Sequence, residues 1–300
     1  MYPSYLNLSK RELTQRIEKL FKILENCEIC PRKCHVNRLK NKKGYCQLGY
    51  LQKVSTYHPH FGEESPLVGR FGSGTIFLTS CNLACVYCQN YEISQLRIGE
   101  EISFERLAEM MINLQNQGCH NINFVTPTPQ VPQIVKSLAV AIEKGLKIPL
   151  VYNTSSYDSV EVLKQLDGLI DIYMPDVRYS DDKIALKYSN TPRYFEIMKE
   201  AIKEMQRQVG NLVLDENGIA IKGLMVRHLV LPNNLAGSEK IFEFIAKEIS
   251  KDIFLNIMDQ YFPYYKAAEF PELARRITDE EFQEALKLAK KFGLKRLYLE

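Results

Sequence analysis

The sequence lacks a long apolar run, and it lacks an excess of either charge. No stretch approaches the roughly 18 consecutive apolar residues of a membrane-spanning helix, so we expect no membrane partner. The 300 residues include 39 lysines and arginines against 36 aspartates and glutamates. This balance argues against a protein built to bind the phosphate backbone of nucleic acids, so we expect no nucleic-acid partner either.

The N-terminus lacks the apolar core and the small-residue cleavage site of a secretory signal peptide. Residues 1–20 have the pattern of a helix instead, and we expect the chain to stay in the cytoplasm. In that compartment, clustered cysteines indicate a metal site more often than disulfides. Seven of the eight cysteines fall between residues 27 and 88, whereas Cys119 is interpreted as a core residue.

The chain is predicted to have two unequal parts, residues 1–73 and residues 74–300. The first contains a helix near 9–26, a cysteine-rich loop at 27–46 and a turn-rich connector with little helix or strand period. In the second, strands are predicted at 75–80, 122–126, 149–155, 169–175, 223–231 and 252–260. Helices are predicted at 103–118, 131–145, 158–166, 181–187, 192–209, 238–249 and 278–292.

Strands that alternate with helices predict right-handed β-α-β crossovers and a parallel sheet. Six such units are fewer than the eight of a closed barrel, so a partial barrel and a doubly wound sheet both fit the periodicity. We expect an α/β fold, a partial (β/α)6 TIM-type barrel with an N-terminal helix and a Cys-rich extension. In either architecture, functional groups gather at the C-terminal ends of the strands.

Three cysteines follow the first of these strands with the spacing C-x3-C-x2-C: Cys81, Cys85 and Cys88. Thiolates are the usual protein ligands of iron–sulfur clusters. Because the loop has no fourth cysteine, a four-iron cluster bound here would keep one iron open for a substrate or cofactor. A structural zinc site would need a fourth ligand, and three unconnected thiols are the remaining alternative. We predict a [4Fe-4S] cluster.

This loop, with Tyr87 before its last cysteine, resembles the signature of the radical S-adenosylmethionine (SAM) superfamily. The resemblance runs from about residue 74 to residue 266. It is strongest to the group related to pyruvate formate-lyase activating enzyme, and whole-chain features resemble the PflX-like branch of that group. These features are CPRKC…GYC, HFGEE, GSGTIF, CVYCQN, NFVTPT, MPDVRY, VRHLVLP and MDQYFPYYKA.

The resemblance implies an oxidoreductase-type enzyme that binds SAM beside the [4Fe-4S] cluster. SAM would chelate the open iron through its amino and carboxylate groups, and the reduced cluster would pass one electron to the sulfonium. The C5′–S bond would then break, giving methionine and a 5′-deoxyadenosyl radical that abstracts a hydrogen atom from the substrate. The protein would orient the cofactor and exclude water.

The resemblance also implies cofactor-binding positions on the strand ends. Tyr87 is expected to pack near the adenine, and Asn90 matches a polar SAM contact just after the last cysteine. Asn153 and Thr154 end the third strand, where the activating enzymes carry a polar ribose contact. No catalytic side chain beyond the cofactor contacts can be named from the sequence.

Two arginines complete this implied set, and two positions depart from the family. Arg178 stands where the activating enzymes carry a lysine, and Arg227 matches an arginine near the SAM carboxylate. The family's Gly-Gly-Glu stretch after the second strand is replaced by residues 126–129, Thr-Pro-Thr-Pro. Since proline has no N–H donor, Thr126 and the other groups here must hold the methionyl end through carbonyls and hydroxyls. A SAM-contacting histidine of the activating enzymes is Tyr265 here.

A second cysteine group lies in the N-terminal part, with the spacing C-x2-C-x3-C-x11-C: Cys27, Cys30, Cys34 and Cys46. Four thiolates suffice for a closed tetrahedral zinc site. They equally suffice for a second [4Fe-4S] cluster, and spacing does not separate the two. Iron here would indicate an electron relay, whereas zinc would indicate a structural clamp; unbound thiols are the third alternative.

Several polar residues carry weaker signals. His58, His60, Glu63 and Glu64 lie in the connector and are interpreted as a polar surface turn, with an acid–base or ligand role near the substrate as the alternative. Asp171 and Asp176 are expected to flank the C-terminal end of the fourth strand, where one could meet a substrate amine. The aromatic cluster at 261–265 is interpreted as core packing rather than a substrate wall.

Three functions remain open. The first is a radical SAM enzyme that acts on a protein or peptide, such as a glycyl-radical enzyme. The second is a radical SAM enzyme with a small-molecule substrate. The third is a non-catalytic electron-transfer or scaffold protein with two metal sites. For the enzymes, the family implies flavodoxin or ferredoxin as the electron donor.

Overall fold

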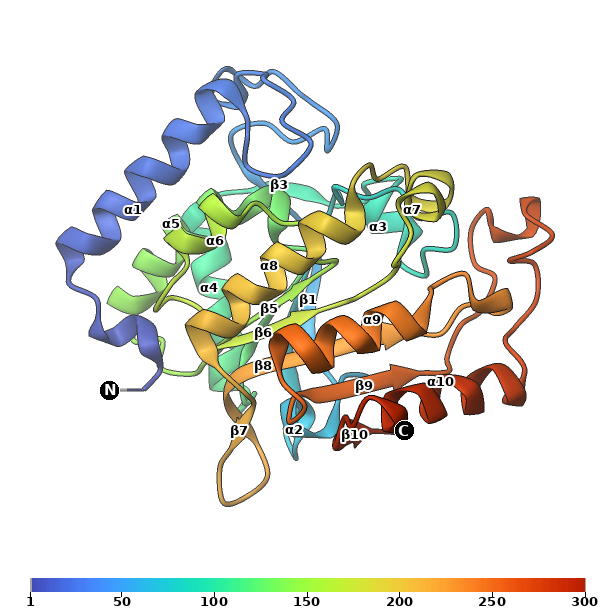
Figure 1. Cartoon of the computed structure of the whole chain (residues 1–300). Helices are drawn as coiled ribbons and strands as arrows, with labels where there is room; N and C mark the ends of the chain where they lie inside the picture. The colour runs from blue at the N-terminus through green and yellow to red at the C-terminus, as the bar shows by residue number, and fades with distance from the viewer. Residues whose placement is uncertain (1, 300) are drawn as a thin grey trace.

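Residues 2–299 are described by the computed structural model, and they form one mixed sheet wrapped by helices (Figure 1). Its strands are β1 (Gln52–His60), β2 (Ser73–Leu78), β3 (Glu100–Ile102), β4 (Ile122–Val125), β5 (Leu150–Thr154), β6 (Ile172–Pro175), β7 (Val213–Leu214), β8 (Ala220–Leu229), β9 (Phe254–Met258) and β10 (Arg296–Tyr298). They follow the order β10-β9-β8-β6-β5-β4-β2-β1-β3, with β7 paired to β8. Neighbours from β2 to β10 are parallel, and the path does not close. The predicted partial barrel and its six strands are confirmed.

The predicted helices are also confirmed, with ends that differ by a few residues. They are α1 (Lys10–Ile23), α4 (Phe104–Asn116), α5 (Val131–Glu143), α6 (Val160–Gln165), α7 (Asp182–Ser189), α8 (Tyr194–Val209), α9 (Ser238–Phe244) and α10 (Asp279–Lys291). Two short helices that were not predicted are also present, α2 (Ser65–Val68) and α3 (Tyr91–Ser94). A π-helical turn, Ile245–Ile249, extends α9. Short 3-10 helices span Ser4–Asn7, Leu24–Asn26, Arg38–Lys40, Thr128–Gln130, Pro232–Asn234 and Ala267–Glu269.

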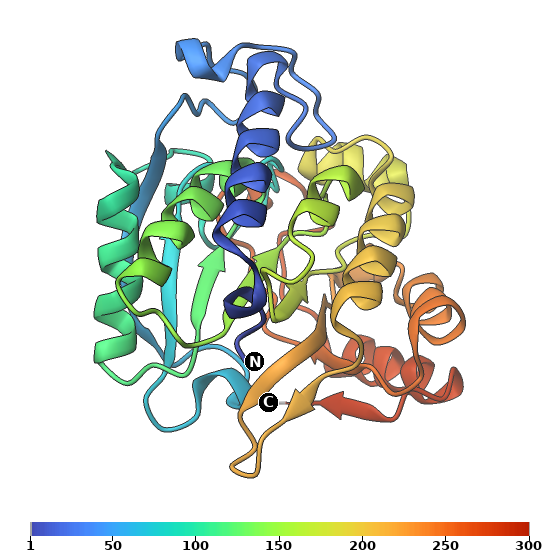
Figure 2. The same cartoon turned by 90° about the vertical axis from the view of Figure 1, so that its left-hand side faces the viewer.

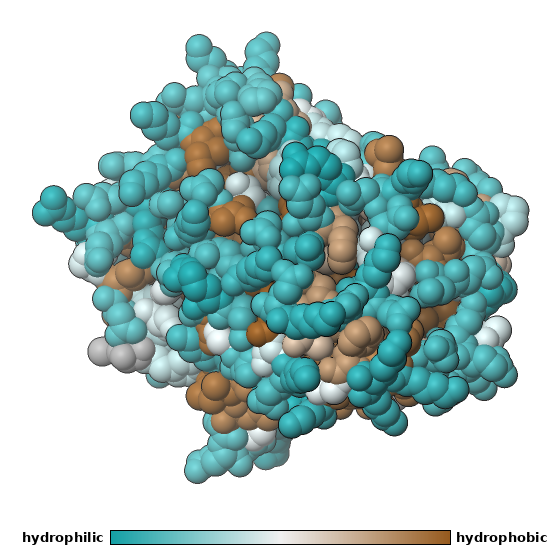
Figure 3. Space-filling view, in the orientation of Figure 1, coloured by the Kyte–Doolittle hydropathy of each residue, from teal (hydrophilic) through white to brown (hydrophobic). Residues whose placement is uncertain are grey.

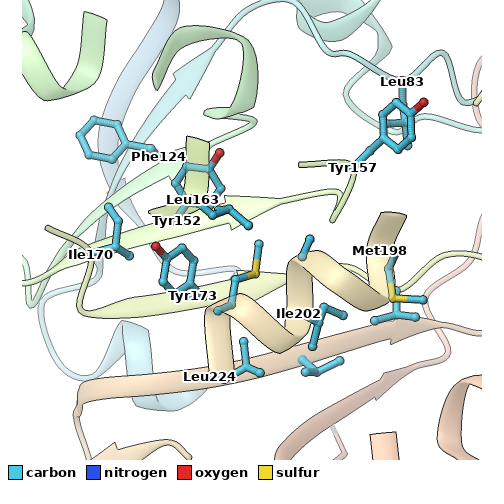
Figure 4. Packing of buried hydrophobic residues seen from close by; sticks show 14 of the residues in the cluster. Leu83, Phe124, Tyr152, Tyr157, Leu163, Ile170, Tyr173, Met198, Ile202 and Leu224 are labelled. Atoms are coloured by element: carbon cyan, nitrogen blue, oxygen red, sulfur yellow. The ribbon is translucent and has the colours of Figure 1, made fainter. Parts of the chain in front are cut away.

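Alternation along the strands divides the apolar residues between two cores. Side chains on the outer face of the sheet, such as Tyr152, Tyr173 and Leu224, pack under the helices in the large core (Figure 4). Their neighbours in sequence point inward because successive residues of a strand face opposite sides. A smaller core inside the barrel contains Leu67 of α2 with Val151, Ile172, Met174, Met225 and Phe254. Leu67 therefore closes the barrel near the N-terminal ends of the strands.

The prediction of a connector without strand or helix was wrong. Residues 52–60 form β1, which is antiparallel to β2, and α2 follows it. The strand escaped notice because Pro59 interrupts it and its inward positions are polar. Since β3 pairs with β1 only from Gln52 to Val54, Pro59 lies on an unpaired edge, where its missing N–H costs no ladder hydrogen bond.

The N-terminal helix packs across the outside of the barrel, along α5 and α6 (Figure 2). Arg16 of α1 donates to the carbonyls of Gln165 and Asp167, at the end of α6. Beyond this helix, the fully buried Arg38 donates to the carbonyl oxygens of Gly49 and Pro129. The cysteine-rich loop is thereby fastened to the C-terminal side of β4.

Asp171 corrects another expectation, because it precedes β6 and lies at the N-terminal end of that strand. Its Oδ1 accepts a hydrogen bond from the Ser4 backbone N–H (2.8 Å), and its Oδ2 accepts one from Leu150 (3.4 Å). Asp171 therefore anchors the N-terminal segment, and it lies at the opposite end of β6 from Asp176.

One face of the molecule is mainly hydrophilic, with apolar side chains in small scattered groups (Figure 3). One group lies over the β7 hairpin, where Val213 and Leu214 are exposed. Within residues 2–299, the structure has no helix of the length and apolar character that crossing a bilayer requires.

Candidate functional site

The three-cysteine loop leaves β2 at a strained turn and lies at the C-terminal edge of the sheet. Ser80 has a positive φ of 71°, which only the surrounding contacts can maintain. Its N–H donates to the Ile93 carbonyl, and the N–H of Ala84 donates to the Ser189 carbonyl at the end of α7. The loop is thus held between α3 and α7, and its three thiols lie near enough to influence one another electrostatically.

Each of these sulfur atoms has its own hydrogen-bond partner. The pairs are Leu83 N with Cys81 Sγ at 3.3 Å, Ser189 Oγ with Cys85 Sγ at 2.9 Å and Ser94 Oγ with Cys88 Sγ at 3.2 Å. Burial, reinforced by the neighbouring Cys85, raises the pKa of Cys81 to about 12. A thiolate at this position therefore needs a positive metal centre beside it. The donor set fits a [4Fe-4S] cluster held by three thiolates.

A chain of hydroxyls leads from the predicted adenine contact to one cluster ligand. Tyr87 donates to the Tyr179 hydroxyl at 2.6 Å, Tyr179 lies 2.7 Å from Ser189 Oγ, and Ser189 donates to Cys85 Sγ. All these groups are buried. Hydrogen bonds to cluster sulfurs stabilise the more negative, reduced state and so raise the reduction potential.

Replacing Ser189 by alanine is therefore expected to lower the reduction potential of the cluster. A loss of about 1 kcal/mol in the reduced state corresponds to a shift on the order of 40 mV for one electron. An EPR-monitored redox titration measures this shift. Ser137→Ala, a buried helical serine in α5, is the matched control and should leave the potential unchanged. Equal potentials for Ser189→Ala and the control would contradict the role assigned to Ser189.

Arg227 of β8 is the hub of a buried polar network inside the barrel. Its Nε donates to Asp176 Oδ1 (2.7 Å), its Nη1 to Glu63 Oε2 (3.0 Å) and its Nη2 to Asn153 Oδ1 (2.9 Å). Arg178 donates to the other oxygen of Asp176 at 2.6 Å. The structure therefore brings together Asn153, Arg178 and Arg227, three of the predicted cofactor contacts. A guanidinium network of this kind suits a carboxylate ligand.

The other predicted contacts lie around this network. Asn90 is exposed and precedes α3, and Tyr87 is buried against Tyr261 in an edge-to-face contact. Thr126 directly follows β4 with a positive φ of 61°, and its N–H donates to the Asn153 carbonyl. The strain at this turn, as at Ser80, is typical of a functional edge.

The hydroxyl of Thr154 faces away from the barrel interior. It donates to Asp158 Oδ2 (2.6 Å), while the hydroxyls of Thr128 and Tyr152 both donate to Asp158 Oδ1 (2.8 Å). Burial raises the pKa of Asp158, against the opposing effect of these three donors. The hydroxyls of Thr128 and Thr154 are thus both bonded to Asp158. The predicted contact of Thr154 with the cofactor therefore concerns its backbone rather than its hydroxyl.

The aromatic segment after β9 divides into buried and exposed parts. Tyr261 is buried and donates to the Leu273 carbonyl, whereas Phe262 and Tyr264 are each 39% exposed. Tyr265 has a positive φ of 52°, and its ring stacks on Tyr91 at 4.9 Å. Core packing therefore accounts for Tyr261, and Tyr265 lies beside the helix that follows the three-cysteine loop.

Glu63 and Glu64 are not surface residues, so the interpretation as a polar surface turn was wrong for them. The side chain of Glu63 is 7% exposed, and Glu64 as a whole residue is 2% exposed. His58 is exposed, and its ring stacks on Phe77 at 5.3 Å. In the sequence, the only sign of a functional role was that two acids are adjacent just before a strand. Their burial depends on the path of the loop, which carries both acids into the barrel.

The pKa of Glu63 predicts a pH dependence of stability. Burial raises this pKa from 4.5 to about 7, with Glu64 and Asp176 adding to the shift and Arg227 opposing it. Between pH 4.5 and 7 the folded state holds a proton that the unfolded state has released. Stability therefore falls as pH rises through this window, by about 3 kcal/mol in total.

Replacing Glu63 by glutamine should remove this contribution. Denaturant unfolding at pH 5, 6 and 7 measures it in the native protein and in the variant. We expect the native protein to lose more stability than Glu63→Gln as pH rises. Parallel curves for the two proteins would show that Glu63 does not titrate in this range.

The four N-terminal cysteines come together in one loop near the surface. Cys27, Cys30 and Cys46 are buried, and repulsion from the other three thiols adds to the effect of burial that raises the pKa of Cys30. Gly44 has no room for a side chain, because a Cβ there would lie 2.7 Å from the Cys34 Cβ. Close approach of the two loop segments therefore requires this glycine.

A bridge of side chains joins this loop to the three-cysteine loop. The guanidinium of Arg32 lies 3.8 Å from the ring centre of Tyr45, and its Nε donates to the Asn82 carbonyl at 2.8 Å. Tyr45 precedes Cys46, and Asn82 follows Cys81. The two cysteine groups are therefore linked through Arg32 by direct contacts.

Over residues 2–299, no three histidine, cysteine or carboxylate side chains converge at the spacing of a single bound metal ion. The thiolates of a four-iron cluster bind different irons and lie further apart than ligands of one ion.

Comparison with known sequences gives a family and two relatives. A family profile described as the radical SAM superfamily matches residues 75–217. The uncharacterized protein MJ0674 of Methanocaldococcus jannaschii is 35% identical over 295 residues, which cover 95% of this chain and 80% of that protein. The uncharacterized protein MJ0808 of the same organism is 24% identical over 313 residues, covering 94% of this chain and 83% of that protein.

Two solved structures share the fold at low identity. One is native anSMEcpe with bound AdoMet and Cp18Cys peptide, with a TM-score of 0.50, 15% identity and coverage of 71% of this chain and 56% of that chain. The other is HydG, a maturase of the [FeFe]-hydrogenase, with a TM-score of 0.52, 11% identity and coverage of 98% and 64%. The chain thus spans less than two thirds of each of these proteins, and the likeness concerns the fold.

Proposed function

The chain belongs to the radical SAM superfamily, and from this premise we propose that it cleaves SAM at a cluster held by Cys81, Cys85 and Cys88 and acts on a protein or peptide. Superfamily membership makes it an enzyme, so the non-catalytic alternative is set aside. The observation that carries the proposal is the arrangement of the three thiols, each with its own hydrogen-bond partner, in a loop that offers no fourth cysteine.

The bound cluster and SAM supply the one-electron cleavage that yields the 5′-deoxyadenosyl radical. The residues of the chain bind and orient these groups. Arg227 and Arg178 provide guanidinium groups for the SAM carboxylate, and Asn153 is held beside Arg227 for the ribose. Thr126 offers a strained backbone for the methionyl end.

Two further residues, Tyr87 and Asn90, would contact the adenine. Tyr87 supplies an aromatic face, and Asn90 supplies an exposed amide next to the last cysteine. The backbone of Thr154 ends β5 beside Asn153. The exclusion of water by the buried walls protects the radical from side reactions.

Two considerations favour a protein or peptide as the substrate. The sequence resembles activating enzymes, which act on proteins such as glycyl-radical enzymes. The same fold also carries bound AdoMet and a peptide in anSMEcpe. A small-molecule substrate is the second candidate, favoured by the buried polar network inside the barrel.

The two substrate classes can be separated by size. An extract of the source organism is divided by dialysis, and each fraction is added to reduced enzyme with SAM. We expect the retained, macromolecular fraction to raise 5′-deoxyadenosine formation above the rate without extract, and protease treatment to abolish this effect. Stimulation by the dialysed small molecules alone would overturn the choice of a protein substrate.

For the N-terminal cysteines we propose a second [4Fe-4S] cluster rather than zinc. The site lies near the surface and is joined by Arg32 and Tyr45 to the loop of Cys81. A cluster there would pass electrons from flavodoxin or ferredoxin toward the SAM site. In the Cys30→Ala variant, SAM cleavage driven by flavodoxin should therefore fall, whereas cleavage driven by dithionite should persist. Zinc in place of iron at this site would overturn the proposal.

A further inference from the structure

The loop between β1 and α2 carries two adjacent carboxylates into the barrel. Glu63 Oε1 accepts a hydrogen bond from Asn123 Nδ2 of β4 at 2.9 Å, and its Oε2 accepts one from Arg227 of β8. Glu64 Oε1 accepts one from Asn256 Nδ2 of β9 at 2.8 Å. Side chains from three strands therefore hold this acidic pair in place, which is more than a surface turn requires.

Two acceptor atoms of this group have no partner within residues 2–299. They are Glu64 Oε2 and Asn123 Oδ1, and both are buried. The Nδ2 of Asn123 donates to Glu63 Oε1, which leaves its Oδ1 as the acceptor without a partner. Buried polar atoms are almost always hydrogen-bonded. The partner missing here must therefore be a hydrogen-bond donor.

The charges of the network also leave a place for a cation. Once Glu63 is ionised, three carboxylates, those of Glu63, Glu64 and Asp176, face the two guanidinium groups of Arg178 and Arg227. The raised pKa of Glu63 reflects this crowding as well as its burial. When Arg227 also binds the carboxylate of SAM, the shortage of positive charge around the acids increases.

The shape of the barrel restricts how a ligand reaches these acids. Leu67 closes the N-terminal end, so a ligand enters from the C-terminal end, past the three-cysteine loop. Phe77 alternates in β2 with Ile76 and Leu78, which pack under the helices, so its ring faces inward. Phe77 therefore offers an apolar ring to the inside of the barrel.

One histidine beside this ring, His60, does not supply the missing cation. His60 lies edge-to-face with Phe77, and burial together with His58 lowers the pKa of His60. His60 is therefore neutral at physiological pH. A ligand that carries its own positive charge can fill this place.

We propose that Glu63, Glu64 and Asn123 bind the ammonium group of an aliphatic amine, which is part of the substrate. A lysine side chain of a protein and a free diamine share this chemistry. The inference rests on the proposed function, because the stem of the amine would lie beside the SAM site, where its hydrogen atom is removed. It deepens that function by naming the recognised group.

The test measures binding to SAM-loaded holoenzyme by saturation-transfer NMR under anaerobic conditions. The probes are Nα-acetyl-lysine methylamide, its norleucine analogue without the amine, and 1,5-diaminopentane. We expect the lysine probe or the diamine to bind, the norleucine probe not to bind, and the affinity to fall at least tenfold in Glu64→Gln. Glu100→Gln, an exposed acid in β3, is the matched control and should bind as the native protein does.

The outcomes separate the inference from the function on which it rests. Binding of the lysine probe indicates a protein-borne amine, and binding of the diamine alone indicates a free one. Equal binding by the norleucine probe, or by a Glu64→Gln variant with a native unfolding midpoint, would overturn the inference. If the native enzyme forms 5′-deoxyadenosine but binds neither amine, the inference fails and the proposed function stands. If no 5′-deoxyadenosine forms, the proposed function itself fails.

Discussion

Simultaneous replacement of Cys81, Cys85 and Cys88 by alanine is expected to abolish the formation of 5′-deoxyadenosine. The rate should fall by roughly three orders of magnitude or more, to the background of a protein without a SAM-binding cluster, because the cluster supplies the electron. Anaerobically reconstituted protein is incubated with SAM and dithionite, and the product is quantified by chromatography. Activity above a tenth of the native rate would contradict the assignment of these ligands.

Cys119→Ala provides the matched control for this variant. Cys119 is a buried thiol in the core, outside both cysteine groups, so its replacement should leave iron content and SAM cleavage close to native. Metal analysis of the triple variant also examines the N-terminal site. We expect about four irons per chain to remain there. Loss of all iron with one zinc retained would instead favour a structural site.

Replacing Arg227 by methionine is expected to destabilise the protein by about 3 kcal/mol at pH 8. The change leaves Glu63 and Asp176 buried without their shared partner, and their side chains are only 7% and 14% exposed. The effect should be smaller at pH 6, because Glu63 can then take up a proton. Denaturant unfolding at the two pH values measures both quantities, and SAM cleavage should fall as well.

A second substitution separates charge from packing. In the double variant Arg227→Met with Glu63→Gln, part of the stability at pH 8 should return, because one unpaired charge is gone. Arg193→Met is the control: this arginine is 70% exposed and pairs with Glu196 on the surface, so its removal should change stability little. A loss at Arg227 no greater than at Arg193 would contradict the role of the buried network.

The periodic elements could be predicted because each carries its own local signal. Strands β4 and β5 are short apolar runs, and α4 begins at Ser103, whose side chain accepts a hydrogen bond from Arg106 N–H. β1 has no such signal, since its inward residues are polar and Pro59 interrupts it. Its pairing with β2 is a non-local contact, which local pattern does not reveal.

The residues of the candidate site also differ in how far the sequence could predict their association. Cys81, Cys85 and Cys88 are near one another in sequence, so their spacing alone predicts a shared cluster. Asn153 and Arg227 are far apart in sequence, and only the family resemblance placed them at one cofactor. Their direct hydrogen bond, and the inward path of Glu63, depend on the order of strands in the sheet.

The sequence by itself determined the α/β class, the positions of the six barrel strands along the chain and the three-thiol loop, because these follow from local period and local spacing. The tertiary structure decided which polar side chains meet inside the barrel. It turned the hydroxyl of Thr154 outward to Asp158 and brought Glu63 inward to Arg227. The physical reason is that side chains alternate between the two faces of a strand. Which face points into the barrel, and which residues meet there, depends on the order and register of the strands.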